Sequence, residues 1–151
     1  MTTTSSEPEV DARHEIAREL LTSLAEVKGW LRDSGRTVYP TYTYNVLASL
    51  ALVDRLGAAR VSALADAARV DVSVVSRQVQ ALEHDGLVVR AADPHDRRAS
   101  LVSLSEDGRK VLEEGRRRMA ALVEERLSGW STADLADVAR TLTRLLDDLR
   151  G

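Results

Sequence analysis

The feature that most constrains the fold is a series of short elements over residues 57–104, set between two stretches of longer helical periodicity. Ser62 is suited to cap a brief helix that extends through Ala68. After a turn, Asp71 is suited to cap a helix over Val72–His84, whose apolar positions 75, 79 and 82 mark one packed face. Gly86 then ends this helix. The pattern predicts two short helices joined by a tight turn.

A β-hairpin is expected directly after these helices. Residues 87–90 read as one strand, and residues 99–104 alternate between apolar and polar side chains as a second. The loop between them, 91–98, is charged and rich in turn-forming residues. Short helix, turn, helix and hairpin make a winged helix-turn-helix, in which a helix fits the major groove of duplex DNA and the hairpin tip reaches beside it.

Two amphipathic helices are predicted ahead of this unit. The first covers residues 9–33 and ends at Ser34-Gly35, and the second begins just after Pro40, runs to about Leu56 and is closed by Gly57. The apolar residues of the first helix repeat at intervals of three or four and are Ile16, Leu20, Leu24, Val27 and Leu31.

Two further helices are predicted after the hairpin. Ser105 caps the first, which continues to about Leu127, and Ser131-Thr-Ala-Asp134 resembles a capping box with Asp in the acidic position. The final helix carries a near-heptad stripe of apolar residues, which are Leu135, Val138, Leu142, Leu145, Leu146 and Leu149.

The fold class that follows is mainly α with a small β-hairpin. Residues 1–8 are expected to be a disordered tail, and residues 9–56 to form N-terminal helices for dimerisation and a ligand region. Residues 57–104 are expected to be the winged helix-turn-helix lobe, and residues 105–151 the C-terminal dimerisation helices. The apolar stripes of the first and last helices exceed what one small winged domain could cover, which favours a homodimer.

The outward face of the second short helix carries candidate DNA-binding residues. At 100° per residue, the positions opposite the packed face are Ser73, Arg77, Gln80 and His84, flanked by Val74 and Ser76. Arg and Gln can make bidentate contacts to base edges, Ser can contact a base or a phosphate, and Val can touch a thymine methyl. An ordinary solvated helix face would show similar residues.

The predicted hairpin tip adds a second group of candidates. Asp96-Arg97-Arg98 places two guanidinium groups at the end of a narrow projection, where they can enter a minor groove or clamp phosphates. Asp96 is unexpected in a pure phosphate site, and a sensible role for it is to pair with an Arg and hold that side chain extended. The alternative is an ordinary charged hairpin turn.

Five segments of this region resemble the MarR family of bacterial transcription regulators. They are Leu64-Ala-Asp-Ala-Ala68, Val72-Ser-Val-Val-Ser-Arg-Gln-Val-Gln-Ala-Leu-Glu83, Asp85-Gly-Leu-Val-Val-Arg90, Asp93-Pro-His-Asp-Arg-Arg98 and Val102-Ser-Leu-Ser-Glu-Asp-Gly108. The resemblance covers residues 60–112 by motif and the whole chain by helix order. The Asp-Arg-Arg wing and the turn after it are its most specific parts.

The resemblance implies a homodimer in which each subunit offers one recognition helix and one wing to double-stranded DNA. It implies that Arg98 enters the minor groove with Asp96 as its partner, and that Arg97 lies near phosphate. Ser73, Val74, Ser76 and Arg77 match the positions that resemble the family's groove-contacting ones. Val74 and the neighbouring Val72 depart from the pattern, because small polar residues or Pro are common there, so no base sequence can be inferred.

The charge balance limits how such a protein can bind DNA. Lys and Arg number 21 against 24 Asp and Glu, and no region of the chain is strongly basic. Binding therefore cannot depend on a diffuse positive surface and has to depend on a few placed arginines, doubled by dimer symmetry, with helix N-terminal amides at phosphates. The cluster Arg116-Arg-Arg118 lies on a long helix and is interpreted as a solvated or salt-bridging face.

Four of the five aromatic residues lie within 15 positions, at the end of the first helix and the start of the second. They are Trp30, Tyr39, Tyr42 and Tyr44. MarR-like dimers commonly respond to small molecules bound where the dimerisation helices meet the DNA-binding lobe, so these residues are candidates for lining an effector pocket. Aromatic residues at a helix junction are more often core filler.

Several other functions are disfavoured. The chain has no Cys, which removes thiol sensing and thiolate metal sites, and its three His residues lack paired metal spacing. No nucleophile, base and acid set stands out, so we expect no enzymatic activity, no metal and no cofactor. The polar start of the chain does not read as a signal peptide and no stretch is apolar enough to span a bilayer, so we expect a cytoplasmic protein without a membrane partner.

The favoured interpretation is a dimeric, sequence-specific transcription regulator, a repressor acting at a pseudo-palindromic operator and released by a small aromatic ligand. The alternative is a winged-helix dimer used as a protein–protein interaction module. Arg97 and Arg98 discriminate between the two, because a protein-docking wing has little need of two exposed guanidinium groups.

Overall fold

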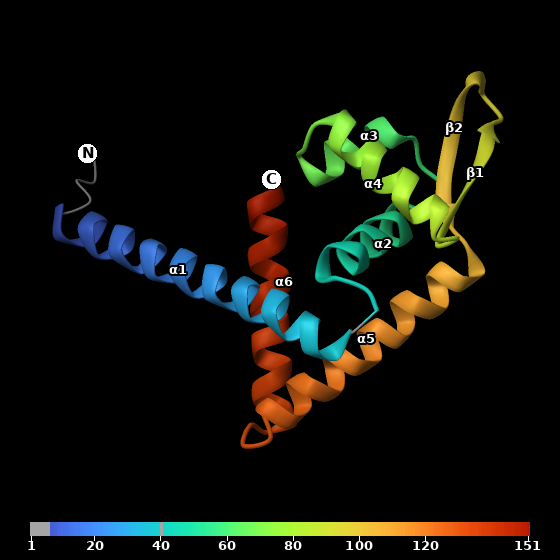
Figure 1. The fold of residues 1–151 in the computed structure, drawn as a ribbon. Helices are drawn as coiled ribbons and strands as arrows, with labels where there is room; N and C mark the ends of the chain where they lie inside the picture. The colour runs from blue at the N-terminus through green and yellow to red at the C-terminus, as the bar shows by residue number, and fades with distance from the viewer. Residues whose placement is uncertain (1–6, 40) are drawn as a thin grey trace. The chain divides into compact units, whose positions relative to one another are not determined.

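The computed structural model describes residues 7–39 and 41–151, which form six helices and one two-stranded sheet in the order α1, α2, α3, α4, β1, β2, α5, α6 (Figure 1). The chain divides into two compact units, Met1–Gly115 and Arg116–Gly151, and the boundary falls within α5. The expected class, mainly α with a small β-hairpin, is confirmed.

Helix α1 spans Glu7–Val38 and is longer than predicted. The predicted tail over residues 1–8 lies mostly outside the described residues, but its last two residues are helical. The predicted stop at Ser34-Gly35 is wrong, because the helix continues through it. Gly35 is buried, and a Cβ added there would lie 3.3 Å from Cβ of Tyr44. The glycine therefore serves the close approach of α2 and does not end the helix.

Helices α2 (Tyr44–Leu56), α3 (Val61–Ala68) and α4 (Val72–His84) follow. Gly57 closes α2 in a positive-φ conformation, as predicted. The predicted cap at Ser62 is wrong, since the N-cap of α3 is Arg60, which makes no side-chain capping bond. The residue before it, Ala59, is paired with Val102 of the hairpin, so the chain passes directly from this bridge into the helix.

The hairpin consists of β1 (Val88–Asp93) and β2 (Asp96–Leu104), which pair antiparallel. Two backbone hydrogen bonds, of 3.0 Å and 2.8 Å, join Ala59 to Val102 on the other side of β2. A buried apolar cluster binds α2, α3, α4 and the base of the hairpin into one core, with Leu50, Leu64, Leu87, Val79 and Val102 among its members.

Helix α5 spans Glu106–Arg126 and α6 spans Thr132–Arg150. The Ser105 hydroxyl accepts a hydrogen bond of 2.9 Å from the amide of Gly108, as expected of a cap. The capping box predicted at Ser131 and Asp134 is confirmed, with both of its reciprocal bonds present. Within the described part of the chain, no helix is long and apolar enough to cross a bilayer.

Candidate nucleic-acid interface

Helix α4 is held against the core by one face and leaves the opposite face to solvent. Its apolar positions 75, 79 and 82 are buried, and its N-cap, Asp71, accepts a 2.8 Å hydrogen bond from the backbone N–H of Ser73. Of the predicted contact residues, Ser73, Arg77 and Gln80 are exposed, whereas Val74 and Ser76 are half-buried. The structure therefore presents two long polar side chains, one turn apart, on the free face of this helix.

The start of α4 is fixed electrostatically as well as by packing. Hydrogen bonds from Ser73, first from its side chain and then from its backbone N–H, lower the pKa of Asp71 below its ordinary value. The carboxylate is therefore ionised at neutral pH, where it complements the positive end of the helix. This cap holds the first turn of α4, the part of a recognition helix that contacts base edges.

The wing is a longer and tighter hairpin than the sequence predicts. Its strands pair from Val88 opposite Leu104 to Ala92 opposite Ser100, and only residues 94 and 95 form the turn. The expectation that residues 91–98 are a loop is therefore wrong. Asp96-Arg97-Arg98 begins β2 and is not the tip itself, although the register shifts between Ala92 and Asp93, so that in this segment only Asp96 has a partner across the hairpin, Asp93. Figure 1 shows the hairpin extending beyond α3 and α4.

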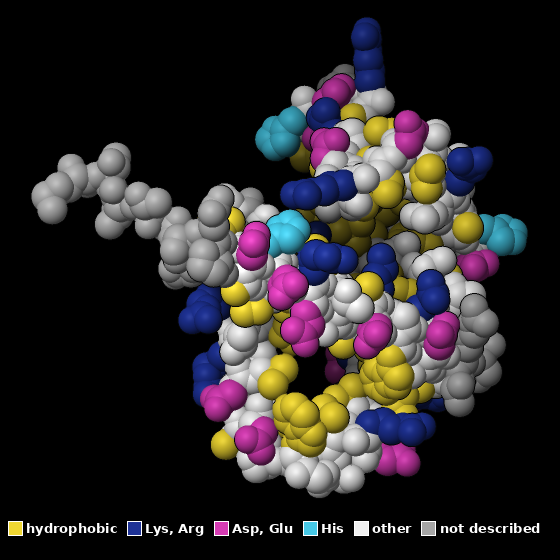
Figure 2. Space-filling model, turned by 90° about the vertical axis from the view of Figure 1, so that its left-hand side faces the viewer, with side chains coloured by type: hydrophobic (Ala, Val, Ile, Leu, Met, Phe, Trp, Pro, Cys, Tyr) yellow, Lys and Arg dark blue, Asp and Glu magenta, His cyan; other side chains and the backbone are white. Residues whose placement is uncertain are grey.

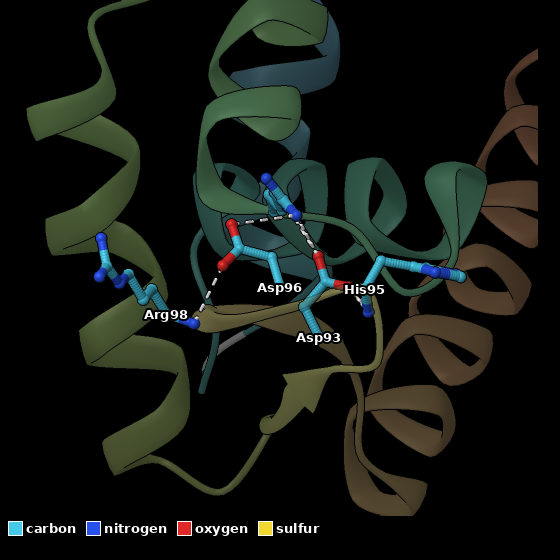
Figure 3. A network of polar contacts seen from close by, with 5 residues as sticks. Asp93, His95, Asp96 and Arg98 are labelled. Atoms are coloured by element: carbon cyan, nitrogen blue, oxygen red, sulfur yellow. Dashed lines mark hydrogen bonds and ion pairs between the residues drawn. The ribbon is translucent and has the colours of Figure 1, made fainter.

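A network of polar contacts encloses the turn of the wing (Figure 3). The side chain of Asp93 is 6% exposed, and its Oδ1 accepts a 2.8 Å bond from the backbone N–H of His95. Its Oδ2 accepts from Arg60, with Nε at 2.7 Å and Nη2 at 2.6 Å. Asp96 lies 3.5 Å from the same Nη2 and accepts a 3.1 Å bond from the backbone N–H of Arg98.

These contacts revise the role expected for Asp96. It forms an ion pair with Arg60, and it contacts Arg98 through the backbone amide. Figure 3 shows the exposed side chain of Arg98 extending away from the two carboxylates. Asp96 therefore orders the backbone that carries Arg98 and leaves the guanidinium directed outward. The surroundings of the Arg97 side chain lie outside what the structure describes.

A second arginine joins the wing to α4. Arg90 of β1 donates from Nε to Glu83 of α4 at 2.9 Å and from Nη1 to Ser100 of β2 at 3.3 Å. Residue 90 faces residue 102 across the hairpin, so Arg90 and Ser100 are diagonal neighbours on it. One side chain thus fixes both strands of the wing relative to the end of α4.

The ion pair at Asp93 predicts a pH dependence of stability. The His95 amide, and then Arg60, hold the pKa of Asp93 below its ordinary value of 3.8. A carboxylate with a lowered folded-state pKa stabilises the fold above its unfolded value, and the contribution is lost as pH falls through the folded value. We therefore expect Asp93→Asn to lower the urea midpoint at pH 5–7 and the difference from wild type to close below about pH 3.8.

Asp66→Asn, at an exposed position of α3, is the control for this measurement and should leave the urea midpoint nearly unchanged over the same range. Asparagine at position 93 can still accept the His95 amide, so the difference isolates the charge. A gap between Asp93→Asn and wild type that stays constant down to pH 3 would contradict the assignment.

The four aromatic residues lie along the junction of the N-terminal helices. Trp30 of α1 is 38% exposed, Tyr42 packs against the buried core, and Tyr44 packs against Gly35. The ring of Tyr39 approaches α5, where it would lie 3.4 Å from a Cβ added at Gly115.

A small apolar pocket lies between α2, α3 and α4. Its lining residues are Ser49, Leu52, Val53, Leu64, Val75, Gln78, Val79 and Leu82. None of the four aromatic residues is among them. An effector site at the aromatic residues stays a prediction.

The apolar stripes predicted for the first and last helices are largely exposed in the single chain. On α1, Val10, Ile16, Leu20, Leu21, Val27 and Trp30 are between 38% and 67% exposed. On α6, Val138, Leu142, Leu146 and Leu149 are between 41% and 66% exposed. Each helix therefore keeps an apolar face that its own compact unit does not cover.

Charges of both signs are interspersed on the face drawn in Figure 2, and no part of that face is uniformly basic. Six acidic and six basic residues are present over residues 57–104, so this region has no net formal charge with His neutral. Contacts to a polyanion would depend on individually placed arginines.

The fold and these contacts define a winged helix-turn-helix. Residues 43–100 match the model of the MarR family. This match confirms, over these residues, the resemblance shown by the sequence motifs.

The chain is also similar to individual proteins, in sequence to one and in fold to others. The chain is 34% identical over 93 residues to YxaD, an uncharacterized HTH-type transcriptional regulator of Bacillus subtilis; the alignment covers 62% of this chain and 65% of YxaD. A MarR family protein from Bacillus stearothermophilus superposes with a TM-score of 0.79 at 22% identity, covering 91% of this chain and 98% of that one. FabT of Streptococcus pneumoniae, solved in complex with DNA, superposes with a TM-score of 0.68 at 20% identity, covering 91% and 97%.

Sequence reasoning missed the arginines that hold the wing. Arg60 contacts a carboxylate 33 positions away, and no local pattern signals that pairing. Arg90 contacts Glu83 and Ser100 only once the register of the hairpin and its angle to α4 are set. Burial of Asp93 beside the turn would have indicated a cationic partner. The pattern of apolar and polar side chains along β1 does not reveal that this residue is buried.

Proposed function

We propose that this protein is a sequence-specific, double-stranded-DNA-binding transcription regulator that acts as a homodimer. The observation that carries the proposal is the juxtaposition, in one unit, of a recognition helix with a free polar face and a wing with an outward-directed arginine. An α-helix fits the major groove and an arginine at a hairpin fits the narrower minor groove. The match to the MarR family and the DNA complex of FabT, a protein of similar fold, support the same function.

Each part of the interface has a distinct role in this proposal. Arg77 and Gln80 contact base edges, and Ser73 and Ser76 contact bases or phosphates near the start of α4. Val74 contacts a thymine methyl. On the wing, Arg98 enters the minor groove and Arg97 contacts phosphate, while Asp96 orders the backbone of the wing.

The dimer is proposed to form through α1 and α6. Each of these helices exposes a row of apolar side chains, whereas an ordinary monomer surface exposes such side chains singly. Packing the two rows against a second copy of the chain would remove their apolar area from water. Dimer symmetry would double the few arginines available for DNA. The same symmetry predicts an operator that is a pseudo-palindrome with half-sites about one helical turn apart.

The regulator is proposed to act as a repressor and to be released by a small aromatic compound bound near Trp30, Tyr39, Tyr42 and Tyr44. The alternative function, a winged-helix dimer for protein contacts, would use the same apolar faces as a scaffold. The outward-directed Arg98 favours DNA over this alternative.

Selection of bound sequences from a random duplex library tests the proposal. We expect inverted half-sites whose centres lie about 10 base pairs apart, and a dimer by light scattering at micromolar concentration. Recovered complexes would then be screened for release by phenolic and other aromatic compounds. Enrichment of no sequence would reject DNA-specific regulation, and a single half-site bound by a monomer would reject the assembly.

A further inference from the structure

Arg60 occupies a rigid position beside the wing. The residue before it, Ala59, forms two backbone hydrogen bonds with Val102 of β2. Arg60 itself is the N-cap of α3, with an extended backbone at φ −70° and ψ 151°. Its side chain makes no capping bond and runs toward the turn of the hairpin, because the antiparallel bridge directs the chain after Ala59 toward the start of β2.

From this geometry we propose that Arg60 is a positioning residue for DNA binding, which sets the direction of Arg98 by holding the turn of the wing. The inference rests on the proposed DNA-binding function. One guanidinium contacts the carboxylates on both sides of the turn, Asp93 at 2.6 Å and Asp96 at 3.5 Å. Asp96 then accepts the backbone N–H of Arg98. The body of the winged helix is thereby connected to the backbone that carries the DNA-contacting arginine.

The charge of Arg60 matters as much as its position. Residues 93–98 contain two aspartates and two arginines, so this segment has no net formal charge with His neutral. Arg60 compensates the buried carboxylate of Asp93 and gives the group a net charge of one positive unit. Without Arg60, the buried carboxylate of Asp93 would lack its cationic partner, and this unpaired charge would destabilise the turn. The same negative charge would repel the DNA phosphates and weaken binding.

An arginine suits this role better than a lysine. The guanidinium is planar and offers several donors in a fixed fork, so it can address two acceptors from one orientation. A lysine ammonium at the same position keeps the charge but cannot hold both carboxylates in that geometry. Arg60→Lys therefore separates the contribution of charge from that of orientation.

The first test uses the free protein and does not depend on DNA. Hydrogen exchange of the His95 and Arg98 amides is measured by NMR in wild type, Arg60→Gln, Arg60→Lys and the control Arg55→Gln, which removes the same charge from an exposed site on α2. We expect Arg60→Gln to speed exchange of both amides about tenfold and Arg60→Lys to speed it less. The amide of Val79, in the buried face of α4, should be unaffected and reports an intact fold.

A double variant identifies the route. The double variant combines Arg60→Gln with Asp93→Asn. If Arg60 acts through Asp93, the exchange rate of the His95 amide in the double variant should be no higher than in the faster of the two single variants. Additive effects would mean that Arg60 and Asp93 act separately. Unchanged exchange of both wing amides in Arg60→Gln would reject Arg60 as the residue that holds the turn, whatever the DNA result.

The second test is affinity for the selected duplex. We expect Arg60→Gln to weaken binding about tenfold or more, Arg60→Lys to be intermediate, and Arg55→Gln to stay within about twofold of wild type. Faster wing exchange with unchanged DNA affinity would overturn the positioning role. Failure of wild type to bind any duplex would instead overturn the proposed function, while the exchange data would still decide whether Arg60 holds the wing.

Discussion

Replacing Gly108 by alanine is expected to destabilise the winged-helix unit by about 3 kcal/mol or more, at the upper end of the cost of overpacking. A Cβ at this position would lie 1.9 Å from the carbonyl oxygen of Leu87 and 2.9 Å from its carbonyl carbon. Both atoms belong to the backbone and cannot rotate away. The first turn of α5 would have to separate from the base of the hairpin.

That separation would also break a set of hydrogen bonds. The Leu87 carbonyl accepts a 3.0 Å bond from the backbone N–H of Ser105. The Ser105 hydroxyl donates to the carbonyl of Gly86 at 2.6 Å and accepts from the amide of Gly108. The turn between β2 and α5, one of the most specific parts of the sequence motif, is thus a packing junction, and glycine is required there for lack of space.

Urea unfolding followed by circular dichroism measures the effect, and Gly29→Ala is the matched control. Gly29 lies within α1 with nothing within 4 Å of an added Cβ, so alanine there should stabilise the protein by about 0.5–1 kcal/mol. A Gly108→Ala variant that unfolds at the wild-type urea concentration would show that α5 does not approach Leu87 this closely.

Replacing Arg98 by alanine is expected to weaken binding to the selected operator by about 1–3 kcal/mol per half-site. The Arg98 side chain is exposed and directed outward, and only its backbone amide is engaged with Asp96. The substitution would therefore remove the proposed DNA contact without breaking the network that orders the wing. Because the proposed dimer has two wings, the total loss amounts to about 2–6 kcal/mol.

Equilibrium binding titrations at several salt concentrations distinguish the contribution of Arg98 from a general charge effect. Arg144→Ala, at an exposed position of α6, removes the same charge and should change the affinity far less. Arg98→Lys should recover part of the loss, since it keeps the charge but not the planar fork. Unchanged affinity and an unchanged salt slope in Arg98→Ala would remove the wing from the mechanism.

The helix ends that the sequence predicted correctly share one property. At Asp71, at Ser131 with Asp134, and at Gly57, the deciding interaction joins groups no more than three positions apart. Such bonds form whatever the rest of the chain does, so residue type and spacing suffice to place them. The free face of α4 followed in the same way from its helical period.

The predictions that were wrong concern positions that local residue type and spacing alone do not decide. Gly35 resembles a helix stop but lies inside α1, because Tyr44 of another helix packs against it. Ser62 resembles a cap, but the bridge between Ala59 and Val102 starts α3 earlier. Position 98 was expected at the tip, but the turn occupies residues 94 and 95 and leaves position 98 within β2. At Gly35 and Ser62 a partner distant in sequence determined the outcome, and local propensity was overruled.

The sequence by itself determined the order of elements, the winged-helix class, and the packed and free faces of α4. These depend on periodicity and on contacts within a few residues. Only the tertiary structure decided how the wing is held, because the pairing of Arg60 with Asp93 and of Arg90 with Glu83 requires α3, α4 and the hairpin to be assembled around one core. An ion pair between distant residues has no sequence pattern of its own, since its geometry exists only after the core has formed.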